Sequence, residues 1–378
     1  MKLLKNKDKE ILNIALPAIV ANITVPLLGL VDVAITGHLG NAAYIAAIAV
    51  GSMLFNVIYW VFGFLRMGTS GMTAQAYGRG DSAETMLLLM RGLCVALAVA
   101  LAVLVLQRPL LALAISVMGV EPSLQPLVRT YFQICVWGAP AMLCLYAFTG
   151  WFIGLQNTRI TMKVSIVQNI VNIVASLTLV YGLGMKIDGV ATGTLIAQWG
   201  GLLVAASYAC LKHRGLLRSL SFRAVTRGEA LMRFFNVNRD IFLRTLFLVA
   251  VNLFFVSAGA TQGTIVLAVN TLLMQLFTLF SYVMDGFAYA GEALCGKYAG
   301  AGDRTGFHAT VRRLFVWGAI LTTAYTAVYA LGGNTFLSLL TDDAPVLAAA
   351  ARYLPWAVAI PVAGVAAFVW DGVFIGTT

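Results

Sequence analysis

The stretch PLLGLVDVAITGHLG, from Pro26 to Gly40, places one carboxylate, Asp32, within the apolar segment 11–36. About 20 apolar residues suffice for a helix to cross a bilayer. An ionised aspartate at the centre of such a helix costs about 2.5–3.5 kcal/mol, so it is expected to face the bundle interior or a water-filled cavity. We therefore predict that Asp32 lies on an ion or proton path. The structural alternative is an aspartate that caps a neighbouring helix.

The composition around this stretch is that of an all-α integral membrane protein. Of 378 residues, 60% are hydrophobic and only 11% charged, whereas soluble domains carry about 25% charged residues. The apolar runs do not alternate as the strands of a membrane β-barrel do. Ten spans are predicted, at 11–36, 42–68, 86–107, 127–150, 158–182, 189–211, 240–260, 264–294, 309–332 and 346–376.

The basic residues predict the orientation of these spans. Nineteen lysines and arginines lie in the N-terminal segment and in the connections after every second span, and four lie in the opposite loops. The positive-inside rule then places the N-terminus in the cytoplasm of a multi-pass protein of a bacterial-type inner (plasma) membrane. The net charge of +10 is thereby explained without a nucleic-acid partner.

A repeat divides the chain. Gly37 and Gly259, Asp81 and Asp303, and the two FIG motifs are each 222 residues apart. One recurring offset indicates a duplication, and the even number of spans before the connection makes the repeats parallel. We predict an amino-terminal lobe at 1–211, a basic cytoplasmic linker at 212–239 and a carboxy-terminal lobe at 240–378. The same offset predicts two further helices beyond Thr378.

Polar residues on the fifth and sixth spans are candidate partners of Asp32. Ser165, Asn169, Asn172 and Ser176 recur on one helical face, and Thr194 follows on the next span. Their oxygens suit a hard cation or a protonated acid. The alternative is hydrogen bonding between helices. Gln168 and Asn169 are also candidates for a substrate cavity.

The eighth span carries a second polar stripe: Thr278, Tyr282, Asp285, Tyr289 and Glu292. Asp285 is the deeper acid, whereas Glu292 is expected to meet Lys297 or water near the cytoplasmic end.

Three further side chains are candidates for the second lobe or the cavity. Asp371 is another buried acid, for which pairing with Arg66 or Arg244 is the alternative. Met53 and Met284 are candidates for lining a plastic apolar cavity.

The remaining reactive residue types argue against an enzyme. The five cysteines form no CxxC pair and the three histidines are scattered. Neither pattern supports a metal centre or a paired catalytic cluster, so we expect a transporter without a cofactor.

Motifs along the whole chain resemble the MATE (multidrug and toxic compound extrusion) transporters of the MOP exporter superfamily, most closely the DinF-like branch. They are LVDVAITGHLG, GMTAQAYGRGD, FTGWFIGLQNTR, NRDIFLRTL, NTLLMQLFTLFSYVMDGFAYAGEAL and WDGVFIGTT. The resemblance implies a monomeric, twelve-helix, two-lobed antiporter, of which about ten helices are present here. Its substrate, a small cationic or amphipathic molecule, leaves as protons or sodium ions enter. The runner-up is a lipid or glycolipid flippase of the same superfamily.

The family's coupling site maps onto four positions. Its helix-one acid matches Asp32, its helix-five Asn matches Asn172, a possible second acid matches Ser176, and its helix-six Thr matches Thr194. Because serine replaces that acid, a proton is favoured over sodium as the coupling ion. The family's kink proline matches Pro17, and Pro26 on the same helix also removes a backbone hydrogen bond.

Overall fold

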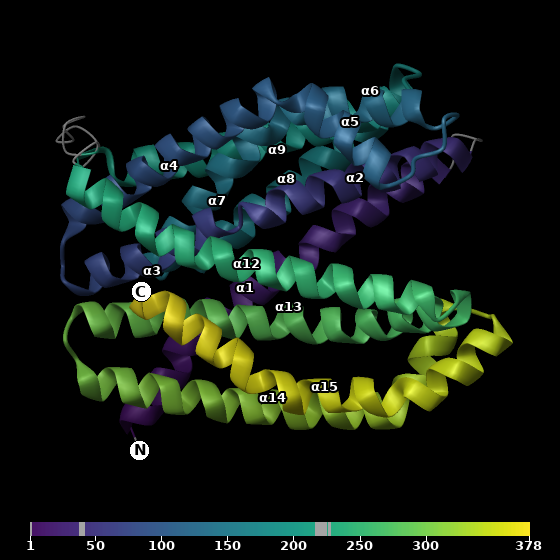
Figure 1. Ribbon diagram of the computed structural model, residues 1–378. Coiled ribbons are helices and arrows are strands. Elements are labelled where there is room, and N and C mark those ends of the chain that lie inside the picture. Colours follow the sequence, from purple (N-terminus) through teal and green to yellow (C-terminus); the bar gives the residue numbers. More distant parts are fainter. Residues whose placement is uncertain (1, 38–41, 216–224, 226–227) are drawn as a thin grey trace.

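The computed structural model describes residues 2–37, 42–215, 225 and 228–378, which form helices and contain no strand (Figure 1). The first half comprises α1 (Lys2–Gly37), α2 (Ala42–Val61), α3 (Phe64–Gly78), α4 (Ser82–Val105), α5 (Gln107–Val117), α6 (Gln125–Cys135), η1 (Val136–Gly138), α7 (Ala139–Gly154), α8 (Thr158–Leu177), η2 (Thr178–Gly182) and α9 (Ile187–Lys212). The second half comprises α12 (Gly228–Thr261), α13 (Thr264–Gly300), α14 (Arg304–Leu340) and α15 (Ala344–Thr377).

These helices account for the ten predicted spans. Nine stretches of the described residues are long and apolar enough to cross a membrane, and α1 contains the predicted segment 11–36. Three of the described spans are composite: α2 and α3 meet at a short break ending at Gly63, α6 continues through η1 into α7, and α8 continues into η2. The predicted all-α membrane fold is confirmed.

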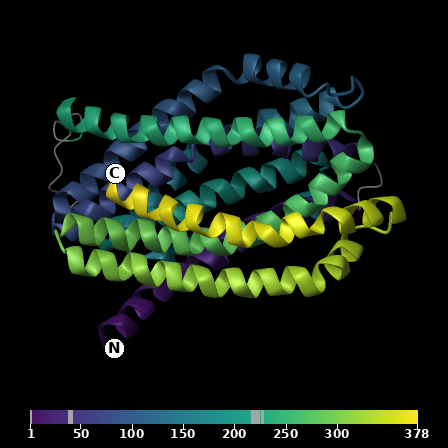
Figure 2. The same ribbon diagram turned by 60° about the horizontal axis from the view of Figure 1, so that its bottom comes forward.

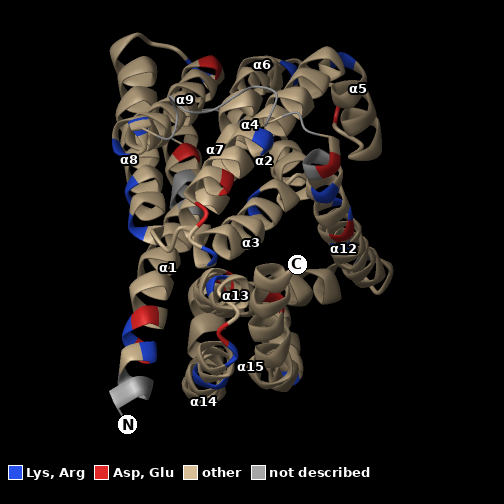
Figure 3. Ribbon diagram, turned by 90° about the vertical axis from the view of Figure 1, so that its left-hand side faces the viewer, with Lys and Arg blue, Asp and Glu red and all other residues tan. Residues whose placement is uncertain are grey.

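Every second connection lies at the same end of the bundle. The start of α1, the C-terminus and the α3–α4 and α13–α14 turns meet there, and we call it the basic end (Figures 1 and 2). Figure 3, viewed from this end, shows α13, α14 and α15 as one group and α4–α9 as another, with α1 and α3 between them. The predicted linker 212–239 is partly helical, because α12 begins at Gly228. Residues 216–224 and 226–227 of this linker lie outside the described residues.

The 222-residue offset recurs in local geometry at the basic end. Gly80 and Gly302 both have positive φ, at 74° and 69°, a conformation that glycine adopts without strain. The aspartate that follows each glycine caps the next helix. Asp81 accepts from the Glu84 backbone N–H at 2.9 Å, and Asp303 accepts from the Gly306 backbone N–H at 2.8 Å. The same cap therefore begins α4 and α14.

Small residues bring α3 of the first half against α13 and α15 of the second. Gly71 lies against the Ile375 carbonyl, Gly78 against the Lys297 carbonyl and Gly300 against the Gln75 carbonyl, so a Cβ at any of them would overlap backbone. Ala74 lies against Gly296 in the same interface. Small residues at this spacing let helix backbones approach closely. We call this interface, at the basic end, the glycine seam.

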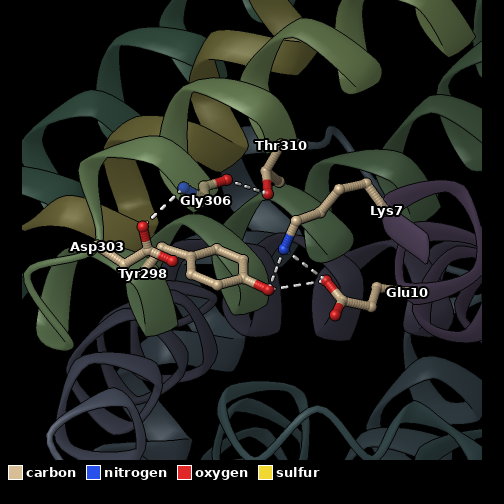
Figure 4. A network of polar contacts seen from close by, with 6 residues as sticks. All are labelled: Lys7, Glu10, Tyr298, Asp303, Gly306 and Thr310. Atoms are coloured by element: carbon tan, nitrogen blue, oxygen red, sulfur yellow. Dashed lines mark hydrogen bonds and ion pairs between the residues drawn. The ribbon is translucent and has the colours of Figure 1, made fainter. Parts of the chain in front are cut away.

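A polar network ties the start of α1 to α13 (Figure 4). The Lys7 ammonium donates to Glu10 Oε2 at 3.0 Å and to the Tyr298 hydroxyl, and that hydroxyl lies 2.8 Å from the same Glu10 oxygen. Burial opposes the charge on Lys7, but these partners together raise its pKa. The network therefore keeps Lys7 protonated where α1 crosses the second half.

The neighbouring Asp8 ties α1 to α14. Arg313 donates through Nε to Asp8 Oδ1 at 2.7 Å and through Nη2 to Asp8 Oδ2, and Trp317 Nε1 donates to Oδ1 at 3.0 Å. The Arg313 guanidinium lowers the pKa of Asp8. Because the folded pKa lies below the unfolded value of about 3.9, this stabilisation is complete above that value and is lost as the pH falls through the folded pKa.

We expect Arg313→Gln to lower the free energy of unfolding at neutral pH, since it breaks the two-point charge pair that joins α1 to α14. The matched control is Arg312→Gln, which removes the same charge from an exposed neighbour and should change stability by less than about 0.5 kcal/mol. Thermal unfolding of detergent-solubilised protein at pH 7 measures both. Equal shifts in the two variants would show that Asp8 does not hold α1 to α14.

Candidate functional site

Asp32 on α1 is 4% exposed and faces α8 and α9. The Thr194 hydroxyl of α9 lies 3.4 Å from Asp32 Oδ2 and 3.1 Å from its own helix carbonyl at Val190, so its single proton is shared between the two acceptors. Asn172 Nδ2 of α8 donates to the Thr194 hydroxyl oxygen at 3.1 Å. Three of the residues predicted to form the site therefore lie in one hydrogen-bonded chain.

Several oxygens around this chain have no donor. Within the described residues, Asp32 Oδ1, Asn172 Oδ1 and the Ser176 hydroxyl are buried without a hydrogen-bond partner. Buried oxygens are ordinarily paired with a protein group, an ordered water or an ion. A proton on the carboxylate would create a donor here, and a cation would satisfy the oxygens directly. The arrangement can therefore exchange a proton or bind a small cation.

A glycine on α9 sets the spacing between the two helices that carry these groups. Gly193 faces Ser176 of α8, and a Cβ there would lie 2.9 Å from the Ser176 backbone nitrogen. No side chain longer than hydrogen fits at that distance unless the helices separate. Gly193 thereby lets Thr194 lie beside Asn172, and Ser176 is fully buried at the contact.

The structure adds two residues of α6 that the sequence did not single out. Tyr131 and Cys135 lie near Asp32, and both are buried. The Tyr131 hydroxyl is 3.2 Å from the Ser52 hydroxyl, and its ring packs directly on Gly51. Their spacing of four residues on an apolar helix resembles ordinary core packing, so the sequence offered no signal that distinguished them.

The polar face of α8 divides into two parts with different partners. Asn169 donates to the Thr24 carbonyl at 2.7 Å, and the Ser165 hydroxyl lies 2.9 Å from that of Thr24. These two side chains join α8 to α1. Asn172 and Ser176, one and two turns further along, lie at the Asp32 site instead. The interhelical hydrogen bonds of the structural interpretation are therefore present in one half of this face, and the other half lies at the Asp32 site.

A small cavity of about 190 Å³ lies between α1, α7 and α8. Gln168 lines it, as the sequence predicted for a cavity residue, together with Ser165, Thr161, Arg66 and Tyr289. Asn169 is not among its lining residues and serves the α1 contact instead. The cavity is polar on the α8 side and is bounded by the second half at Tyr289.

Glu292 is 1% exposed and pairs with Arg66 of α3, whose Nη1 lies 3.3 and 3.2 Å from the two carboxylate oxygens. The Arg66 guanidinium also lies over the Tyr289 ring, 4.3 Å from its centroid. The expectation that Glu292 meets Lys297 or water is therefore wrong. The glycine seam brings α3 onto this face of α13, so Arg66 reaches Glu292 from the first half.

A second arginine neutralises Asp371. Arg244 Nη2 of α12 lies 2.5 Å from Asp371 Oδ1 of α15, which is the pairing that the sequence left as the alternative. Asp285 lies near Arg66 and Arg244, yet among the described residues no ion pair within 4.0 Å is formed by its carboxylate. Among the described residues, Asp285 is thus the acid of this cluster that lies near both arginines without a direct ion pair.

The other predicted residues are placed as follows. Met284 is fully buried in the core formed with Phe280 and Phe287, so it does not line a cavity as expected. Met53 is 54% exposed on α2. The backbone carbonyl of Tyr282 accepts a hydrogen bond from Asn22 Nδ2 of α1 at 3.2 Å.

Pro17 and Pro26 both lie inside α1, which continues as a helix past each of them. Within the described residues, no group of three or more His, Cys, Asp or Glu is placed to hold a metal ion.

Comparisons with known proteins agree with this architecture. The MatE family model matches residues 17–178 and 241–378. DNA damage-inducible protein F of Escherichia coli (strain K12) is 37% identical over 380 residues, which cover 100% of this chain and 82% of that protein. The chain therefore belongs to the MatE family and is a DinF-like MATE transporter.

Solved structures show the same fold. The crystal structure of MATE in the bent conformation superimposes with a TM-score of 0.86 at 20% identity, covering 100% of this chain and 84% of that one. The outward-facing conformation of a multidrug resistance MATE family transporter of the MOP superfamily gives 0.85 at 19% identity, with 99% and 85% covered. At these identities the likeness establishes the fold.

Proposed function

We propose that this transporter exports small organic cations or related toxic compounds in exchange for protons, and that Asp32 carries the proton. The observation that carries the proposal is the buried Asp32–Thr194–Asn172 chain, beside which three oxygens find no donor among the described residues. A solved relative described as a multidrug resistance transporter supports the substrate class. No cofactor is required for this activity.

The choice of ion follows from the charge of the site. Asp32 is the only carboxylate among the four side chains predicted to form it, and Ser176 occupies the position where a second acid would strengthen sodium binding. One carboxylate with neutral oxygens gives a sodium ion weak charge compensation in a buried site. A proton neutralises the same carboxylate completely, and its O–H then supplies the donor that the neighbouring oxygens lack.

Export follows from the different affinities of the two protonation states. With Asp32 ionised, the amino-terminal half attracts a cationic substrate. Protonation from outside removes that attraction, releases the substrate and lets α1 repack against α8 and α9. The halves then reopen inward, where Asp32 loses its proton. Only the difference in affinity between the states can drive such a cycle.

The pairing of Arg66 and Arg244 argues against the flippase alternative. An anionic headgroup would need free guanidinium groups inside the bundle. Arg66 and Arg244 are instead paired with Glu292 and Asp371, respectively. The acid at this level that has no ion pair among the described residues is Asp285, and when ionised it favours a cationic substrate over an anionic one.

The test is efflux of a fluorescent lipophilic cation from proteoliposomes under an imposed pH gradient without sodium. We expect Asp32→Asn to reduce gradient-driven efflux at least about tenfold, because the amide cannot exchange a proton. The matched control is Asp342→Asn, which removes an exposed acid and should leave efflux within about twofold.

Three outcomes would count against parts of this proposal. Unchanged efflux in Asp32→Asn would reduce Asp32 to a structural residue and direct attention to Asp285. Efflux that appears only when a sodium gradient is added would contradict proton coupling. Loss of efflux in both variants would point to an effect of removing negative charge in general.

A further inference from the structure

A charged recess lies at the basic end, away from the sites described above. It has a volume of about 350 Å³ and opens between the end of α3, the start of α4 and the start of α12. It is lined by Met72, Gln75, Arg79, Glu84, Leu88, Arg91, Glu229 and Arg233. Three arginines thus face two glutamates, and the recess carries a net positive charge.

The three arginines differ in their surroundings. Arg91 is 2% exposed, and it pairs with Glu84 at 2.7 Å and donates to the Val225 carbonyl at 3.3 Å. Glu229 also takes part in an interaction. Arg79 and Arg233 are exposed, and in the part of the chain that is described no carboxylate within 4.0 Å pairs with either of them. Two guanidinium groups from different halves therefore point their charge into one recess.

A shallower groove of about 580 Å³ continues from this recess along α12. The two share Glu229 and Arg233, and the groove adds Met232, Asn236 and Val237. The Met232 side chain is 62% exposed. A charged pocket thus opens onto a groove in which the apolar side chain of Met232 is exposed and that of Val237 is partly buried.

We infer that the recess and groove bind one anionic phospholipid, with its phosphate between Arg79 and Arg233 and an acyl chain along α12. The chemistry fits because guanidinium groups bind phosphate oxygens through paired donors. The location fits because the positive-inside rule predicts that the basic end faces the cytoplasmic leaflet, where anionic lipids and basic residues meet. A lipid bound there would join α3 and α4 of the first half to α12 of the second. This inference does not depend on the ion or substrate proposed above.

The test is binding of short-chain phosphatidylglycerol to the detergent-purified protein, with phosphatidylcholine of the same chain length as the comparison. Each basic residue near an anionic headgroup contributes about 1 kcal/mol, or about fivefold in affinity. We therefore expect the double variant Arg79→Gln/Arg233→Gln to bind phosphatidylglycerol about twenty-five-fold more weakly than the wild type. Arg304→Gln/Arg312→Gln removes two exposed charges from α14 and should bind within about twofold.

Further control variants and a competition experiment distinguish a bound lipid from other ligands. Arg79→Lys/Arg233→Lys retains the charge, so it should keep most of the affinity and also checks folding. Equal binding of phosphatidylcholine would overturn the inference, as would equal weakening in both glutamine variants. Displacement of phosphatidylglycerol by millimolar inorganic phosphate would identify a free-phosphate site instead. Single Arg79→Gln, at the exposed end of α3, serves if the double variant does not fold.

Discussion

Glu292→Ala is expected to lower the free energy of unfolding by about 3 kcal/mol, because it leaves the Arg66 guanidinium buried without its carboxylate. Glu292 is 1% exposed, and the Arg66 side chain is 12% exposed. Asp285 lies near Arg66 and offsets part of the loss. Thermal unfolding in detergent, or trapping of the unfolded state in bicelles, measures the change.

The design of this experiment separates a buried pair from charge in general. Glu121→Ala, which removes an exposed acid, should change stability by less than about 0.5 kcal/mol. The double variant Arg66→Met/Glu292→Leu replaces both charges with apolar groups, and we expect it to recover most of the stability that Glu292→Ala loses. If Glu292→Ala were as stable as Glu121→Ala, the Arg66–Glu292 ion pair would not contribute to the free energy of unfolding.

Gly78→Leu is expected to hold the two halves apart at the basic end and to reduce transport at least about tenfold. The Gly78 position faces the Lys297 backbone carbonyl across the glycine seam, and a side chain there would overlap it. Backbone atoms cannot move aside as a flexible side chain can, so the helices must separate. Because the seam joins two halves, each of which contains a hydrophobic cluster formed by its own residues, the variant should still fold.

Accessibility of the seam distinguishes separation from misfolding. A cysteine placed at Ala74, which is fully buried in the seam, should react with a bulky maleimide faster in the Gly78→Leu background than alone. The matched control is Gly332→Leu, since Gly332 lies in α14 with open space around it. Unchanged labelling at Ala74 together with normal transport would show that the seam tolerates bulk and does not close the basic end.

Much of this architecture could be read from the sequence. The apolar runs predicted every span, since a long apolar helix has no other stable environment than the membrane or a large core. Asp32 could be identified from the sequence because an ionised aspartate within an apolar span has a high free-energy cost. The offset of 222 residues paired Asp81 with Asp303, and the structure shows that both cap a helix after a glycine of positive φ.

Interhelical contacts were harder to predict. Periodicity placed Asn169 and Asn172 on one face of α8, but it could not say that Asn169 would bond the α1 backbone and Asn172 the Thr194 hydroxyl. It likewise placed Glu292 on the polar stripe of α13 and assigned it the wrong partner. The arginine that pairs with it lies 226 positions earlier in the chain, and no local pattern links the two.

The sequence by itself therefore determined the class of protein, the number and approximate limits of its spans and the acid on which its proposed chemistry depends. These properties follow from hydropathy and helical period, which are local. Only the tertiary structure decided that Thr194 and Asn172 lie at Asp32, that Arg66 pairs with Glu292, and that glycines bring the backbones of α3 and α13 into contact at the basic end. Such pairs depend on how far one helix is shifted along another and at what angle they cross, and this is set by packing of the whole bundle.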